Sequence, residues 1–263
     1  TFSCQRMERF RHGRVLFAGD AAHGVSPFGA RGANGGVQDA ENLAWKLAWV
    51  LKRGAPDALL DSYGAEREAA ADENILHSTR STDFITPKNA ASRAFRDATL
   101  TLARDYPFAR RLVNSGRLSV PAVFSDSPLN TADADAFAGG LLPGAPCADA
   151  PIRAEGREGW LLDEVGDAFV ALGFGGAEQA ETMAGLGEHL ALRPILVVPA
   201  GSAVPQGRDL RVIEDAEGLI AQRYGAAPGT LYLLRPDQHV AARFRRIGVD
   251  AVRAAFARAT GGV

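Results

Sequence analysis

The clearest change in hydrophobic pattern lies within the first fifty residues. The apolar run from Val15 to Ala18 does not alternate with polar residues, which predicts a short strand buried on both faces of an α/β sheet. Glycines are frequent after it, and beyond Gly35 helical spacing continues as far as Arg53. The pattern predicts a strand, a glycine-rich loop and a long helix. The positions expected to share the helix's apolar face are Val37, Leu43, Leu47, Val50 and Leu51.

Helical spacing also dominates the next fifty residues. Residues 57–84 are predicted to form a short helix followed by a longer polar one, and Pro87 then interrupts the pattern. Residues 90–104 form the next predicted helix, and residues 107–113 a further turn or two. The apolar positions at helical spacing in the third of these helices are Phe95, Ala98 and Leu102.

A change of composition marks a candidate domain boundary. Proline, glycine, aspartate and alanine dominate residues 125–151, which is typical of a linker stiffened by proline. We place the boundary near residue 135. The predicted domains are therefore residues 1–135 and residues 136–263.

Strands and helices alternate in the second predicted domain. The expected strands are residues 160–162, 168–172, 194–198, 230–234 and 239–244, and the expected helices are residues 178–192, 218–224 and a last one carrying Val249, Val252 and Phe256. This order is typical of a thioredoxin-like α/β domain. A thioredoxin needs two cysteines directly after the strand at 168–172, and this sequence has none there. We therefore expect a structural or dimerisation role for this domain.

The overall composition narrows the class of protein. The chain has 263 residues, of which 46% are hydrophobic and 23% charged, as in an ordinary globular protein. Its net charge of −2 gives no reason to expect nucleic acid or an anionic membrane as a partner. There is no apolar run near the roughly 20 residues of a spanning helix, and residues 1–14 lack the apolar core of a signal peptide. Cys4 and Cys147 fit no metal or redox motif, which favours two free thiols in a reducing cytoplasm.

The residues between the predicted strand and helix suit an anionic or hydroxylated ligand. Asp20 follows the strand's carboxyl end, where a carboxylate can accept hydrogen bonds from a ribose or ribityl hydroxyl. The alternative is that Asp20 caps the next turn. Four glycines within residues 27–36 permit close backbone approach, and the helix start offers free N–H groups. Their spacing does not match GxGxxG, and that dinucleotide fingerprint occurs nowhere in the chain.

The stretch from Gly13 to Arg67 resembles a known family. It reads GRVLFAGDAAHGVSPFGARGANGGVQDAENLAWKLAWVL, followed by LLDSYGAER, and is similar to the second FAD-binding motif of the FAD-dependent aromatic-ring hydroxylases. These single-component flavin monooxygenases include phenol and hydroxyphenylpropionate hydroxylases. The resemblance implies that Gly19 and Asp20 contact the ribityl and pyrophosphate region of FAD. It also implies that the isoalloxazine is lined by Pro27, Gly29, Gly32, Ala33 and Asn34, and that the helix start at Gly35 points at the N1–C2=O edge.

The same resemblance indicates the C-terminal part of a longer enzyme. The family's first motif, the GxGxxG unit that holds the ADP half of FAD, is absent from this sequence. We expect the chain alone to be inactive and unable to hold FAD tightly. The segment RYGAAPGTLYLLRPDQHVAARF resembles the thioredoxin-like domain of phenol-hydroxylase-type members. The predicted fold class is thus α/β, with part of a flavin-binding α/β domain and helices followed by a thioredoxin-like domain.

The resemblance also implies a reaction. NAD(P)H would reduce FAD, O₂ would add at the flavin C4a, and the hydroperoxide would hydroxylate a small phenol-type substrate. No side chain in this sequence is predicted to be catalytic, and the scattered histidines share no metal-ligand spacing. In the family the position of His23 belongs to the FAD loop rather than to a catalytic base. Arg67 is expected to pair with a carboxylate, and Arg31 either to pair near the flavin or to be solvated.

Two other interpretations remain open at this point. The chain could be a non-catalytic, thioredoxin-like assembly module with a vestigial FAD half-site, which the missing GxGxxG favours. It could also be a flavin oxidoreductase without oxygen insertion, because the motif identifies the cofactor and not the outcome. The sequence does not specify the oligomeric state, and a symmetric homodimer is the commonest form.

Overall fold

The chain folds into two compact units. One unit consists of residues 1–44 and 63–122, and the other of residues 45–62 and 123–263. A single long helix, α1 (Arg31–Arg53), contributes its N-terminal part to the first unit and its C-terminal part to the second. The computed structural model describes residues 3–27, 31–113, 120–202 and 210–262. The domain boundary near residue 135 stays a prediction.

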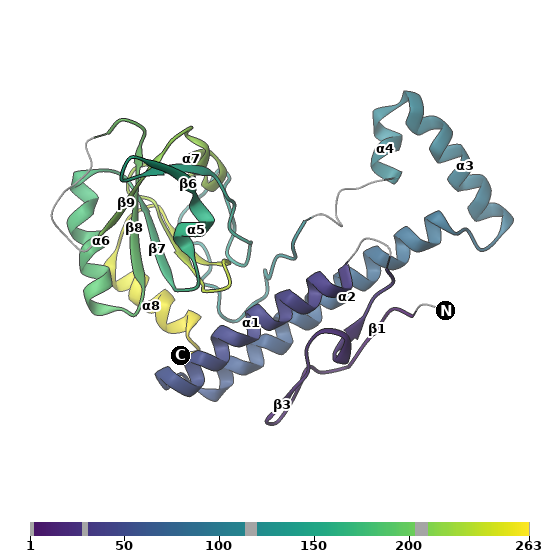
Figure 1. Cartoon of the computed structure of the whole chain (residues 1–263), viewed down its shortest axis with the longest axis horizontal. Coiled ribbons are helices and arrows are strands. Elements are labelled where there is room, and N and C mark those ends of the chain that lie inside the picture. The colour runs from purple at the N-terminus through teal and green to yellow at the C-terminus, as the bar shows by residue number, and fades with distance from the viewer. Residues whose placement is uncertain (1–2, 28–30, 114–119, 203–209, 263) are drawn as a thin grey trace. The chain divides into compact units, whose positions relative to one another are not determined.

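Two short antiparallel ribbons open the first unit (Figure 1). The first pairs β1 (Gln5–Arg6) with β4 (His23–Gly24), and the second pairs β2 (Arg11–His12) with β3 (Val15–Leu16). A 3-10 turn, η1 (Gly19–Ala21), lies between β3 and β4. Both ends of the Gly19 turn are thereby held by backbone pairing.

The apolar run at Val15 is not the doubly covered strand that its pattern predicts. Val15 is 55% exposed, and among the described residues its paired strand is β2. Gly13, at φ +60°, forms with Arg14 the two-residue turn that joins these strands into a hairpin. The prediction was wrong because a run of apolar residues does not reveal how many strands flank it.

Two long helices form the body of the first unit. α1 is followed by a 3-10 turn, η2 (Asp57–Leu60), and by α2 (Asp61–Ile85), and Figure 1 shows α1 and α2 running side by side. The polar helix predicted to end near Phe84 is confirmed by α2. However, α1 begins at Arg31, four residues before the predicted start. Its first turns therefore contain the residues that were predicted to form the second half of the glycine loop.

The buried side of α1 is largely polar. Val37 and Leu51, both assigned to an apolar face by their spacing, are 67% and 77% exposed. The buried positions follow a different helical series, which consists of Gly35, Asp39, Asn42, Trp45 and Lys46. The predicted apolar face was wrong at Val37 and Leu51, because polar side chains that bond to other segments occupy the inward positions. Leu43 and Val50 of the predicted face are partly buried and pack against hydrophobic cores.

Two shorter helices complete the first unit. These are α3 (Ala90–Asp105) and α4 (Pro107–Val113), as the spacing predicts. The side chain of Asn89 caps α3 by accepting a hydrogen bond from the Ser92 backbone N–H. Phe95 is nevertheless 59% exposed, so the apolar face of α3 is not a core face among the described residues.

A seven-stranded mixed sheet forms the centre of the second unit. The spatial order is β11-β10-β7-β8-β9-β5-β6, in which β7, β8 and β9 are parallel and their neighbours antiparallel. The strands are β5 (Pro151–Ala154), β6 (Arg157–Trp160), β7 (Val170–Phe174), β8 (Arg193–Pro199), β9 (Arg211–Asp215), β10 (Leu231–Leu234) and β11 (Val240–Phe244). This arrangement confirms the α/β fold class.

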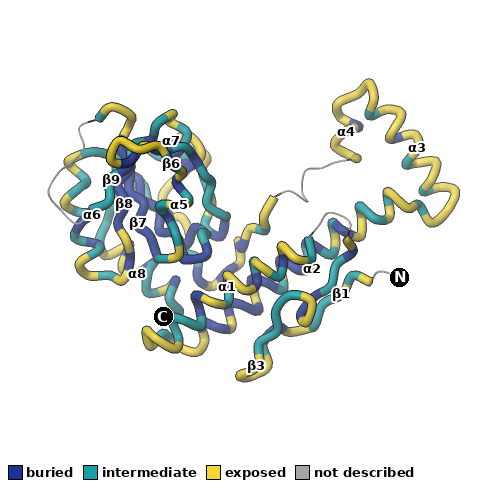
Figure 2. The backbone as a smooth tube through the Cα atoms, viewed as in Figure 1, coloured by how far each residue is buried: buried dark blue, intermediate teal, exposed yellow. Residues whose placement is uncertain are grey.

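Helices cover both faces of this sheet, and Figure 2 shows β7 and β8 buried between them. The helices α6 (Ala177–His189) and α8 (Val249–Ala259) pack on one core, and α5 (Leu161–Val165) and α7 (Leu219–Tyr224) pack on the other. Trp45 and Trp49 of α1 join the first core, where their rings meet Phe169 with centroids 5.5 and 5.1 Å away. The C-terminal part of α1 is therefore a structural element of the second unit.

Three elements of the second unit escape the sequence pattern. Residues 160–162 were predicted as a strand, but Trp160 ends β6 and α5 begins at Leu161. Strand β5, which forms a hairpin with β6, and strand β9 were not predicted, because both are short and carry charged residues. Across the described part of the chain, every helix is too short or too polar to cross a membrane.

Candidate functional site

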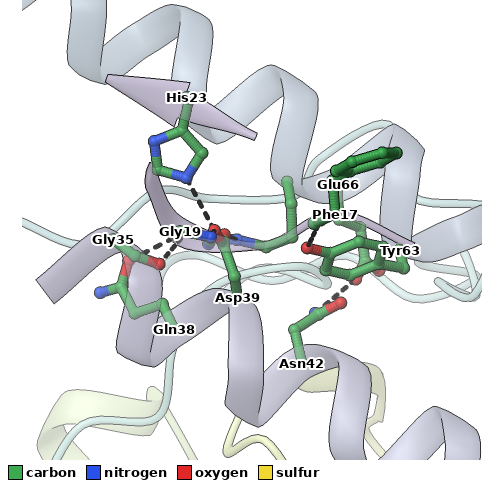
Figure 3. A network of polar contacts seen from close by, with 10 residues as sticks. Phe17, Gly19, His23, Gly35, Gln38, Asp39, Asn42, Tyr63 and Glu66 are labelled. Atoms are coloured by element: carbon green, nitrogen blue, oxygen red, sulfur yellow. Dashed lines mark hydrogen bonds and ion pairs between the residues drawn. The ribbon is translucent and has the colours of Figure 1, made fainter. Parts of the chain in front are cut away.

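A buried carboxylate organises the region around the Gly19 turn. Asp39, on α1, is completely buried, and its two oxygens accept three hydrogen bonds (Figure 3). Oδ2 accepts from the Gly19 backbone N–H at 2.9 Å and from His23 Nε2 at 2.7 Å. Oδ1 accepts from Arg67 Nε at 2.6 Å. One side chain thus connects η1, β4 and α2 to the N-terminal part of α1.

The charges within this network balance. Burial alone raises the pKa of Asp39, but the hydrogen bond from His23 and the charge of Arg67 outweigh burial, so its pKa lies below the ordinary value. Asp39 is therefore ionised, and the guanidinium of Arg67 neutralises it. This confirms the expectation that Arg67 pairs with a carboxylate.

Neighbouring residues of α2 reinforce the same junction. Tyr63 donates its hydroxyl to the Phe17 carbonyl at 2.7 Å, and burial raises the pKa of Tyr63. Glu66 accepts from Asn42 Nδ2 at 2.7 Å, and both side chains are buried. With Arg67 on Asp39, three α2 residues within one helical turn and a half hold β3 and α1 in place.

Two glycines of α1 are required by packing within the chain itself. A Cβ on Gly36 would lie 3.3 Å from the Gly19 Cα, and a Cβ on Gly35 would lie 3.1 Å from the Cε1 of His23. Gly19 adopts φ +58°, a conformation that favours glycine. The Gly19 turn and the second turn of α1 therefore meet backbone to backbone.

The predicted cofactor residues lie on both sides of this junction. Gly19 and Asp20 form η1, while Gly32, Ala33, Asn34 and Gly35 lie in the first turns of α1, and Pro27 is exposed just before that helix. Gly29 lies outside the described residues. The helix begins at Arg31, so the Gly35-Gly36 pair lies beyond its first turn and not at its N-terminus.

Asp20 has the accessibility that a ligand contact requires. Its side chain is exposed, and among the described residues it takes part in no hydrogen bond or ion pair. Asp20 therefore does not cap the following turn, which was the alternative interpretation. The carboxylate remains available beside the start of α1.

Sequence reasoning missed the residue at the centre of the site. Asp39 reads as an acid placed near a helix N-terminus, where the macrodipole favours it. The available signal was the helical series of Gly35, Asp39 and Asn42, which places small and polar residues on one face. Arg31, expected to pair near a flavin or be solvated, donates to Asn74 Oδ1 at 2.9 Å and to the Val120 carbonyl at 3.3 Å.

Two family matches divide the chain in order. The FAD binding domain matches residues 1–78, and the HcaD C-terminal domain matches residues 148–259. The first match contains the entire Asp39 network, and the second contains most of the seven-stranded sheet.

Curated relatives match almost the full chain. The tetracenomycin A2 monooxygenase-dioxygenase of Streptomyces glaucescens is 37% identical over 92% of this chain and 40% of the relative. The 6-methylpretetramide 4-monooxygenase of Streptomyces rimosus is 33% identical over 95% of this chain and 45% of the relative. A hydroxyphenylpropionate/hydroxycinnamic acid hydroxylase of Paraburkholderia xenovorans is 29% identical over 92% of this chain and 46% of the relative. The chain thus spans less than half the length of these relatives.

Solved structures share the fold. The flavin-dependent monooxygenase PieE, solved with FAD and substrate, superposes with a TM-score of 0.74 at 22% identity, over 97% of this chain and 49% of that one. Aklavinone-11 hydroxylase, solved with FAD and aklavinone, gives a TM-score of 0.71 at 22% identity, over 99% of this chain and 46% of that one. Residues 1–78 thus match the FAD binding domain family, residues 148–259 match the HcaD C-terminal domain family, and the chain is homologous to FAD-binding aromatic hydroxylases.

Proposed function

We propose that the Gly19 turn and the first turns of α1 form part of the FAD site of an aromatic-ring monooxygenase. The observation that carries this proposal is the Asp39 network, which fixes the turn against α1 while leaving Asp20 exposed. The Gly19–Gly36 approach brings two backbone segments together without side chains between them. These features fit a hydroxylated, anionic cofactor.

The proposed contacts divide between the two segments. Asp20 accepts a hydrogen bond from a ribityl hydroxyl, as a carboxylate at such a turn can. Pro27 and the residues up to Asn34 lie along the isoalloxazine. The first turn of α1 faces the N1–C2=O edge, where the positive end of the helix dipole stabilises the negative charge of reduced flavin without reorganising.

The proposed reaction is hydroxylation of a small phenol-type substrate. FAD supplies the oxygen-transferring chemistry when it is bound, with NAD(P)H as the reductant and O₂ as the co-substrate. The names of the curated relatives support this class, since they include monooxygenases, a hydroxyphenylpropionate hydroxylase and a putative polyketide hydroxylase. This chain's own residues orient the cofactor and keep the Gly19 turn rigid.

For the second unit we propose a structural role in assembly, with a homodimer as its product. The segment after β7 is Gly175-Gly176, so the position of a thioredoxin's thiol pair has no sulfur. Cys147 is half-buried, and desolvation raises its pKa to about 12, which keeps the thiol protonated and unreactive.

The non-catalytic alternative has one specific observation in its favour. The three hydrogen bonds that Asp39 accepts all come from the protein itself, from Gly19, His23 and Arg67, so the network does not depend on a cofactor. In that case the junction between η1 and α1 would be only architectural, and no flavin would bind.

Two measurements test the proposal. Titration of the purified chain with FAD, followed by quenching of flavin fluorescence, tests the site, and saturable binding supports it. NAD(P)H oxidation by the FAD-loaded enzyme, with and without phenolic compounds, tests the reaction. A hydroxylated product identified by mass spectrometry supports oxygen insertion, whereas NAD(P)H oxidation without product supports a flavin oxidoreductase of another kind.

A further inference from the structure

One buried polar atom in the Asp39 network has no partner among the residues that the structure describes. His23 is 4% exposed, and its ring stacks on Phe10 with centroids 5.7 Å apart and an interplanar angle of 16°. Its Nε2 is bonded to Asp39. Its Nδ1 is buried and has no hydrogen-bond partner within the part of the chain that the structure describes. Buried polar atoms in folded proteins are almost always paired, so this exception requires an explanation.

The network determines what kind of partner Nδ1 needs. The Asp39 carboxylate is already neutralised by Arg67, so no second positive charge is required at His23. Because Oδ2 of Asp39 is a pure acceptor, the imidazole must present its proton on Nε2. A neutral imidazole with the proton on Nε2 has a lone pair on Nδ1. The missing partner is therefore a hydrogen-bond donor and not a phosphate, which would repel that lone pair.

The position of the ring indicates where the donor comes from. The Cε1 of His23, which is bonded to Nδ1, faces the missing side chain of Gly35 in α1. Figure 3 shows the second ring nitrogen on the side of the ring away from Asp39, above the start of α1. This places the lone pair beside the helix turns to which we assign the flavin.

We propose that His23 Nδ1 accepts a hydrogen bond from the ribityl–isoalloxazine part of FAD, either from a ribityl hydroxyl or from the flavin N3–H. This inference rests on the proposed function. It adds a specific flavin-binding residue, and it gives Asp39 a second task, because Asp39 fixes the tautomer that makes Nδ1 an acceptor. The phosphates of FAD offer only acceptors, so the bond excludes the pyrophosphate as the partner, and the position of the ring beside Gly35 favours the flavin half of the cofactor.

Two substitutions separate this role from a structural one. His23→Gln places an amide N–H near the position of Nε2 and keeps the bond to Asp39, but it removes the acceptor at Nδ1. His23→Asn places an amide oxygen near the position of Nδ1 and gives up the bond to Asp39. We expect His23→Gln to keep the melting temperature of the wild type and to weaken FAD binding about tenfold, as loss of one hydrogen bond does. We expect His23→Asn to melt earlier and to lose less affinity.

A spectroscopic readout tests the contact directly. In ¹⁵N-histidine-labelled protein, addition of FAD should move the His23 Nδ1 resonance upfield while that of Nε2 stays in place, as expected when a lone pair accepts a hydrogen bond. FAD methylated at N3 distinguishes the two donors. A retained shift assigns the ribityl hydroxyl, and a lost shift assigns N3–H.

The outcomes separate this inference from the proposed function. Equal FAD affinity of the wild type and His23→Gln, with an unmoved Nδ1 resonance, overturns the inference and leaves the FAD site standing. Because the chain alone is not expected to hold FAD tightly, the titration extends to FAD concentrations that saturate a weak site, and a wild type without saturable binding there overturns the proposed function, and the inference with it.

Discussion

Arg67 and Asp39 form a buried ion pair with Nε 2.6 Å from Oδ1, although they are 28 positions apart in the sequence. Neither side chain is more than 3% exposed. Because the same carboxylate also holds the Gly19 N–H and the His23 ring, the pair determines the relative positions of three segments. Its loss should therefore affect both stability and the candidate cofactor site.

Removing one partner of this pair should be costly. Arg67→Met leaves Asp39 buried and unpaired, and we expect a loss of about 3–5 kcal/mol in the free energy of unfolding. Urea denaturation measures it. The matched control is Arg253→Met, which removes an exposed pair with Asp250 and should cost less than about 1 kcal/mol. Similar costs for the two variants would contradict the central place of the Arg67–Asp39 pair.

The close approach of Gly36 to Gly19 should make a single methyl group harmful. Gly36→Ala puts a Cβ 3.3 Å from backbone, so the turn must move away from α1. We expect the variant to lose stability and FAD affinity together. Gly185→Ala in α6 is the control, because its Cβ would meet nothing within 4 Å and it lies outside the candidate FAD site. Alanine should stabilise that helix position by up to about 1 kcal/mol. Two variants that behaved alike would argue against the backbone contact.

Because Asp39 is ionised in the folded chain, the free energy of unfolding should fall at low pH. Its pKa in the folded chain lies below 3.8, its ordinary value, so the stabilisation is fully present above that value. The stabilisation is lost as the pH falls from there through the folded-state pKa. We expect Asp39→Asn to be less stable than the wild type at pH 7 and the difference to shrink in acid. Thermal melts between pH 7 and pH 3 would show it, and a difference that grew on acidification would contradict the assignment.

The C-terminal part of α1 should be necessary for the second unit. Phe169 meets Trp45, Trp49 and Phe256 with ring centroids 5.1–5.5 Å away. Phe169→Ala should lower the free energy of unfolding by about 3–5 kcal/mol and shift the tryptophan emission. Phe95→Ala, at a position 59% exposed, should change stability by less than about 1 kcal/mol. A mild effect at Phe169 would mean that the ring cluster contributes little.

Sequence reasoning found the elements better than their surroundings. The apolar runs that became β7, β8 and β10 are read easily because a strand covered by helices on both sides is apolar throughout. The run at Val15 looks the same but lies in a hairpin, since its pattern does not record its neighbours. The helix at Phe95 was found by spacing, yet spacing does not say whether another element covers it.

The candidate site was located from its glycines, but its organisation was not. Gly35 and Gly36 read as the point where a glycine loop becomes a helix beside a ligand, whereas in the structure they lie beyond the first turn of α1 and make room for His23 and Gly19. Local propensity favours a loop there, and tertiary contacts at Asp39 favour the helix. A carboxylate that bonds residues 20 and 28 positions away leaves no short-range pattern to read.

The most direct test of the account is the affinity of this chain for FAD with and without the exposed carboxylate at Asp20. Fluorescence titration should show weak but saturable binding to the wild type, binding weakened at least about tenfold in Asp20→Ala, and unchanged binding in Asp126→Ala, which removes an exposed aspartate of the second unit. Equal binding by all three proteins would contradict the assignment of the Gly19 turn to the flavin.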